Sequence, residues 1–157
     1  MKKELLKGFT MLALIVAIAL VSAVVTANAQ TSRQIVADVP FEFSIGYKTL
    51  PTGQYIMQTL ASAGDGLLIQ SADAKTSALR PSEATAPMKH KTYARLIFHR
   101  YGERYFLAQV WSGDSSGRQL LKSQEERAIE LELASIAANG ESAQAAYEIV
   151  EVVAMPR

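Results

Sequence analysis

Residues 93–111 read YARLIFHRYGERYFLAQVW, and this stretch decides the fold. Aromatic and aliphatic residues lie on both sides of Gly102-Glu103, a pattern typical of two strands joined by a tight turn. Within the first strand the side chains divide between two faces: Ala94, Leu96 and Phe98 on one, Tyr93, Arg95, Ile97 and His99 on the other. The stretch therefore predicts an antiparallel hairpin with at least one buried face.

Further strands are predicted on the N-terminal side of this hairpin. Residues from Ile35 to Ile45 alternate in polarity, as in a strand with one buried face. Pro40 removes a backbone donor there, so we expect an edge strand or a bulge. The turn Leu50-Pro51-Thr52-Gly53 follows. Shorter strands are expected over residues 55–60, 67–69 and 75–79. Residues 81–91, with two prolines and little periodicity, predict a surface loop.

One helix is predicted on the C-terminal side. Ser123-Gln124-Glu125-Glu126 is a capping-box pattern, in which Ser123 accepts from the amide of Glu126 and Glu126 reaches back to that of Ser123. Helix formers continue to Ala138, and Asn139-Gly140 supplies a stop. Residues 129–133 also alternate, so a strand is the alternative there. A last strand is expected over 146–154.

The sum is a mainly β fold with six to seven strands and one helix at about 123–138. Sequential hairpins indicate an antiparallel sheet, closed as a small barrel or folded as a sandwich. No internal repeat or second domain is indicated. We therefore expect residues 30–157 to form a single β-rich domain.

Residues 1–29 have the pattern of a secretory signal peptide. Lysines at 2, 3 and 7 precede an apolar run over 8–25, and Ala27 and Ala29 suit cleavage after Ala29. The alternative is an uncleaved anchor, because the run is about as long as the shortest spanning helices. With cleavage no membrane span remains, and the expected location is periplasmic or secreted.

Composition excludes several classes of protein. The leader contains three lysines and one glutamate, so the remaining chain has 13 basic and 14 acidic residues. A near-neutral domain of this kind is not expected to bind nucleic acid. The chain has no cysteine, which excludes disulfides and a lipid anchor on an N-terminal cysteine.

No set of residues has the spacing of a catalytic, cofactor or metal site. The chain lacks a Gly-x-Ser-x-Gly elbow and the Gly-Lys-Ser/Thr ending of a phosphate loop. His90 and His99 lack the close spacing of zinc ligands. His90 is expected in a solvated loop and His99 as a hydrogen-bonding residue of the hairpin. A hydrolase using His99 with Glu103 or Asp114 is the least favoured alternative.

The hairpin supplies the candidate contact surface. Its members are Tyr93, Arg95, His99, Tyr101, Tyr105 and Trp111. Facing outward, the aromatic side chains would stack on a glycan or an envelope protein; facing inward, they would belong to the core. Cross-strand cation–π pairs are the expected use of the arginines. We predict a non-enzymatic binding or structural module, with a barrel that binds an apolar ligand as the alternative. The sequence leaves the oligomeric state open.

An ordered set of motifs resembles a known family. They are VPFEF at 39–43, LPxGxY at 50–55, LxFxRYGxxYFL at 96–107, Trp111 and SxxER at 123–127. In this order the motifs resemble a family of short exported bacterial proteins of unknown function, each with a signal peptide and one β-rich domain. The match spans residues 39 to about 127. The resemblance implies export and a β-rich fold, and supplies no catalytic residues.

Overall fold

The hairpin that the sequence predicts is present in the computed structural model. It consists of β7 (Ala94–Tyr101) and β8 (Arg104–Ser112), joined by a turn at Gly102. Gly102 has a φ of 61°, a conformation that glycine adopts without strain. One extra residue, Ala108, forms a bulge in β8, so that Leu107 and Val110 both point into the core.

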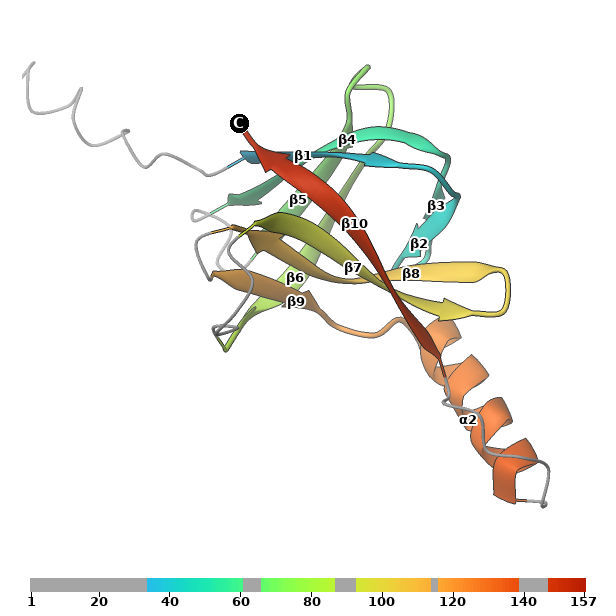
Figure 1. Cartoon of the computed structure of the whole chain (residues 1–157). Coiled ribbons are helices and arrows are strands. Elements are labelled where there is room, and N and C mark those ends of the chain that lie inside the picture. Colours follow the sequence, from blue (N-terminus) through green and yellow to red (C-terminus); the bar gives the residue numbers. More distant parts are fainter. Residues whose placement is uncertain (1–33, 61–65, 87–92, 114–115, 139–146) are drawn as a thin grey trace, which may run out of the picture. The chain divides into compact units, whose positions relative to one another are not determined.

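The structure describes residues 34–60, 66–86, 93–113, 116–138 and 147–157 (Figure 1). The leader and the predicted helix stop at 139–140 lie outside these ranges. The remaining elements are β1 (Gln34–Val39), β2 (Phe43–Ile45), β3 (Lys48–Leu50), β4 (Gly53–Leu60), β5 (Gly66–Ser71), β6 (Ser77–Thr85), β9 (Gly117–Leu120), α2 (Gln124–Ala138) and β10 (Glu148–Pro156).

The strands form one sheet in the order β3-β2-β8-β7-β10-β1-β4-β5-β6-β9. Pairing between β8 and β9 closes eight of the strands into a barrel, with β2 and β3 outside the closed ring. Among the described strands, the pairings are antiparallel except the contact of β2 with β8 at Ser44 and Phe106. The mainly β, antiparallel prediction with one helix is confirmed, and the closure selects a barrel over a sandwich. The ten described strands exceed the six to seven predicted.

The three additional strands are β3, β9 and a second strand from the predicted 35–45 segment, which divides into β1 and β2; β6 is also longer than predicted. Residues 81–85, predicted as loop, belong to β6. Pro81 is tolerated because it stands where β6 stops pairing with β5 and begins to pair with β9 at Ser82. β9 itself has the sequence Gly-Arg-Gln-Leu, which carries no apolar alternation. The interruption between β1 and β2 begins at Pro40, where the strand structure ends before it resumes at Phe43.

The barrel interior is filled by large side chains. The alternation predicted from Ile35 to Ile45 is confirmed, because Ile35, Val39 and Phe43 are all buried. Near Phe43 the rings of Tyr55 and Phe98 pack edge to face, with centroids 5.1 and 5.3 Å away. The other fully buried interior side chains include Leu50, Met57, Leu67, Ile69 and Leu96. Burial of these side chains supplies the main stabilisation of the barrel.

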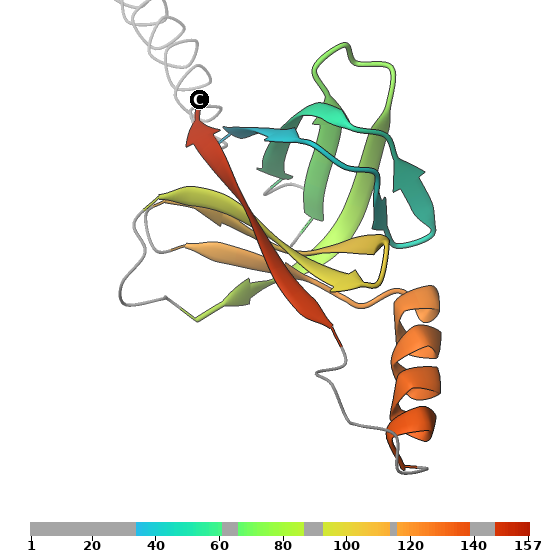
Figure 2. The same ribbon diagram turned by 45° about the vertical axis from the view of Figure 1, so that its right-hand side comes forward.

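Helix α2 begins against the barrel and then runs away from it (Figures 1 and 2). Glu126 is its only buried residue, and most residues beyond Glu130 are exposed. The helical prediction for 129–133 is confirmed over the strand alternative. Among the described residues, no helix has the length and apolar character needed to cross a membrane.

Candidate functional site

At one end of the β7–β8 hairpin, the outer face is covered by Arg95 together with the rings of Trp111 and Tyr93. The Arg95 side chain is fully buried, and its guanidinium carbon lies 4.9 Å from the Trp111 ring centroid and 5.3 Å from that of Tyr93. Arg95 and Trp111 are register partners, so the predicted cross-strand cation–π pairing is confirmed. Because Arg95 and Trp111 are buried, they do not form an open contact surface.

The other end of the same face is covered by α2. Tyr101 is buried, and His99 is mostly covered. Tyr105 points to the opposite face and stacks on Phe41, with a centroid separation of 3.9 Å. Of the six residues predicted as a contact surface, only Tyr93 is exposed. Of the two alternatives that the sequence left open for these residues, the structure shows the covered one for all but Tyr93.

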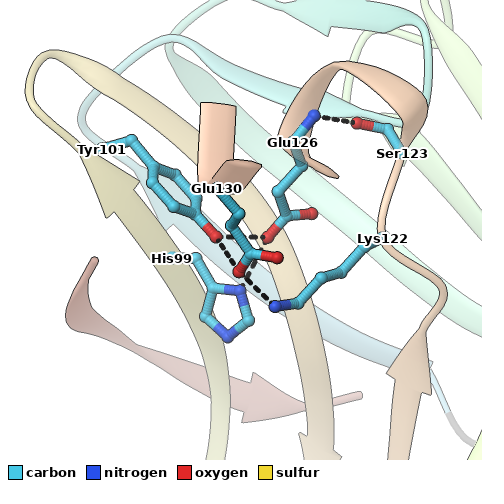
Figure 3. A network of polar contacts seen from close by, with 6 residues as sticks. All are labelled: His99, Tyr101, Lys122, Ser123, Glu126 and Glu130. Carbon is cyan, nitrogen blue, oxygen red and sulfur yellow. Dashed lines mark hydrogen bonds and ion pairs between the residues drawn. The ribbon is translucent and has the colours of Figure 1, made fainter. Parts of the chain in front are cut away.

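Under α2 the structure brings together a network of polar side chains (Figure 3). His99 Nδ1 and Glu126 Oε1 are 2.7 Å apart. The Tyr101 hydroxyl donates to Glu130 Oε1 at 2.7 Å and to Glu126 Oε1 at 3.3 Å. Lys122 forms an ion pair with Glu130. We call these five residues the joint, because they connect the hairpin to the helix.

The sequence explains why these side chains meet. His99 and Tyr101 are two residues apart on β7 and share its outer face, while Glu126 and Glu130 are four apart and share one face of α2. Ser123 starts the helix, because its Oγ accepts from the Glu126 amide at 3.0 Å. This half of the predicted capping box is confirmed. The Glu126 carboxylate, however, binds His99 and Tyr101 rather than serving as the predicted reciprocal cap.

An aromatic ring from a third segment completes the joint. Tyr147, immediately before β10, lies 4.1 Å from the His99 ring and 5.5 Å from the Tyr101 ring, centroid to centroid. Lys122 Nζ lies 5.3 Å from the centroid of Tyr147. The chain therefore contacts the joint both where it enters α2 and where it returns to the barrel.

The electrostatics of the joint favour a neutral Tyr101 beside a charged Glu130. Burial, followed by the hydrogen bond to Glu130 and the nearby carboxylates, raises the pKa of Tyr101 far above its ordinary value. Burial alone would raise the pKa of Glu130. The hydrogen bonds from Lys122 and Tyr101 and the charges of Lys122 and His99 together outweigh burial, and the pKa of Glu130 is lowered.

This arrangement is suited to fixing the helix. Tyr101 keeps its proton, so it is a donor and not a base. Lys122 supplies the cation that the carboxylate of Glu130 requires. Within the described ranges no group of three or more His, Cys, Asp or Glu has the arrangement of a metal site. His99 and Tyr101 thus find their hydrogen-bond partners on the helix, as buried polar groups require.

His99 is a hydrogen-bonding residue of the hairpin, as predicted, and its carboxylate partner is Glu126. Glu103 is exposed in the hairpin turn, and His90 and Asp114 lie outside the described residues. Sequence reasoning missed Lys122, Glu126 and Glu130 as partners of the hairpin. The available signal was the four-residue spacing of the two glutamates, directly after a helix start.

Comparison of the chain with protein-family models, with curated proteins and with solved structures finds no match. The family resemblance drawn from the sequence motifs therefore stays a prediction. Function is inferred instead from the geometry of the joint and of the surfaces around it.

Proposed function

We propose that this chain is an exported, non-enzymatic binding module of the cell envelope or extracellular space, and that helix α2 is its contact element. The leader pattern at 1–29 supports export. The joint supports the second part, because it anchors the helix at one end only. The contact surface thus moves from the hairpin, where the sequence predicted it, to the helix that covers the hairpin.

The observation that carries this proposal is the exposure of the far end of α2. Leu131, Leu133 and Ile136 are 72, 36 and 41% exposed. A helix of 15 residues is about 22 Å long, and short helices are marginal in water without packing. Exposed leucine and isoleucine in such a helix indicate a surface that packs against a partner.

The helix also indicates what kind of partner it fits. Ile129, Leu133 and Ile136 follow the i, i+4, i+7 spacing of an amphipathic helix that binds in an apolar groove. Glu132 lies beside this face and is exposed, which favours a groove with a basic rim. Aliphatic anchors of this kind suit a protein partner better than a glycan, whose rings stack on aromatic side chains.

The two alternatives have less support. A barrel that carries an apolar ligand needs interior space, whereas large side chains fill the described interior. A hydrolase needs a free nucleophile beside His99, whereas the nearest described polar groups are engaged in the joint.

Site-specific photo-crosslinking tests the proposal. A photoreactive amino acid replaces Leu133 in the full chain, which is expressed in cells that export it. A matched probe replaces Lys75, exposed in the turn between β5 and β6. We expect a discrete protein adduct from position 133 that disappears when Ile136→Ser is added, and no such adduct from position 75. Equal adducts from both positions, or none from position 133, would contradict the proposal.

A further inference from the structure

A second surface feature lies on the β2–β3 hairpin, where Tyr47 occupies the turn between the two strands. Its side chain is 92% exposed, the highest value among the large hydrophobic residues that the structure describes. Gly46 precedes it with a φ of 65°, which makes the turn tight. The ring is therefore presented to solvent by a short, well-defined turn.

Arg80 of β6 lies beneath this turn. Its guanidinium carbon is 5.7 Å from the Tyr47 ring centroid. A Cβ at Gly46 would lie 2.5 Å from the same carbon, so the guanidinium packs closely against the Gly46 backbone. Arg80 thus contacts the turn and places a planar cation beside the exposed ring.

Lys48, which follows Tyr47 in the chain, supplies a second cation on this hairpin. Its Nζ donates to the Ser77 carbonyl at 2.7 Å, which positions the ammonium group at the start of β6. Within the described part of the chain, neither Lys48 nor Arg80 forms an ion pair with a carboxylate. The exposed ring therefore lies beside the Arg80 guanidinium, and no carboxylate of the described residues neutralises the charge of Arg80 or of Lys48.

We propose that Tyr47, Lys48 and Arg80 form a binding site for an acidic saccharide. A sugar ring stacks on the free face of Tyr47, while its carboxylate accepts hydrogen bonds from Arg80 and Lys48. The planar guanidinium suits a carboxylate because it offers two parallel donors. The site contains no residue of α2. It gives the domain a second kind of ligand, a saccharide, in addition to the protein partner proposed for α2.

The experiment uses calorimetry with the mature protein and a defined probe, trigalacturonate, with neutral maltotriose as the matched sugar. We expect trigalacturonate to bind, with affinity that falls as salt rises, and maltotriose to bind at least about tenfold more weakly. Tyr47→Ala and Lys48→Gln should each weaken trigalacturonate binding about five- to tenfold. Both side chains are exposed, so neither change should alter the melting temperature.

Tyr93→Ala is the control, because Tyr93 is also an exposed tyrosine but lies on the β7–β8 hairpin side of the barrel. This variant should bind trigalacturonate as the parent does. The proposal is overturned if trigalacturonate does not bind. It is also overturned if maltotriose binds equally well, or if Tyr47→Ala and Tyr93→Ala behave alike.

Discussion

Replacing Glu126 by Gln is the sharpest perturbation of the joint. The change keeps the size of the side chain and removes its charge, at a position whose side chain is 5% exposed. Glu126 Oε1 contacts His99 at 2.7 Å and accepts from Tyr101 at 3.3 Å. Both contacts are made by the same oxygen, which the amide oxygen of glutamine can replace only as an uncharged and therefore weaker acceptor.

The expected cost follows from the two hydrogen bonds that the substitution weakens. A hydrogen bond to a charged group contributes about 1.5–3 kcal/mol, and the weaker amide acceptor retains part of it. We therefore expect Glu126→Gln to lower the free energy of unfolding by about 2 kcal/mol. For a domain of this size, that corresponds to a fall of about 6–10 °C in melting temperature.

Glu125→Gln is the matched control. Glu125 occupies the same helical turn, but its side chain is exposed and forms a surface ion pair with Arg104. Such pairs contribute little, so we expect a loss below about 1 kcal/mol. Urea unfolding of the two variants, followed by circular dichroism, gives the comparison. Equal losses for the two substitutions would refute the inference that the buried Glu126 carboxylate anchors α2.

Three further predictions concern the hairpin and the joint. Trp111→Ala should lower the free energy of unfolding by about 3–5 kcal/mol, because the ring is buried against Arg95, whereas Tyr93→Ala should lower it far less. Urea unfolding of the two variants measures the losses, and similar losses would contradict the prediction. Lys122→Gln should raise the pKa of Glu130, because the substitution removes the Lys122 charge and hydrogen bond that offset the effect of burial. Carbon NMR titration of the Glu130 carboxyl group measures this pKa, and an unchanged value would contradict the ion pair. Since the pKa of Glu130 is lowered in the folded state, its contribution to stability is present above its ordinary value of 4.5 and is lost as the pH falls through the lowered value. Because the pKa of Tyr101 is raised, this residue should not ionise near pH 10 in the folded protein. Ultraviolet titration should therefore count the same number of ionising tyrosines in the parent and in Tyr101→Phe. One tyrosine fewer in the variant would contradict the burial of Tyr101 against the two glutamates.

The strands with regular alternation could be predicted from the sequence. β1 places apolar residues at every second position, and this pattern determines which of its faces is buried. The β7–β8 hairpin was predicted from the aromatic and aliphatic residues on both sides of its turn, and residues on both of its faces are buried. β9 could not be found in the same way, because Gly117 to Leu120 contains one aliphatic residue and depends on β6 and β8 for its structure. Pro81 concealed the second half of β6, since the change of pairing partner there is a tertiary feature.

The candidate site was harder to predict for a related reason. The outer face of the hairpin carries aromatic and basic residues, a composition that fits either an open contact surface or a covered layer. One end of this face is covered by α2, whose start at Ser123 was predicted from the capping pattern but whose placement was not. The sequence distance of 27 residues between His99 and Glu126 gives no local signal of their contact. Such pairings arise from the way the chain closes the barrel.

Amide hydrogen exchange of the protein tests the central claim most directly, namely that α2 is anchored at its first turns and open beyond them. We predict protected amides over 127–130, near the joint, and rapid exchange over 131–138, with protection of β7 and β8 far above both. Protection of residues 131–138 equal to that of the barrel strands, in protein without a partner, would contradict the account.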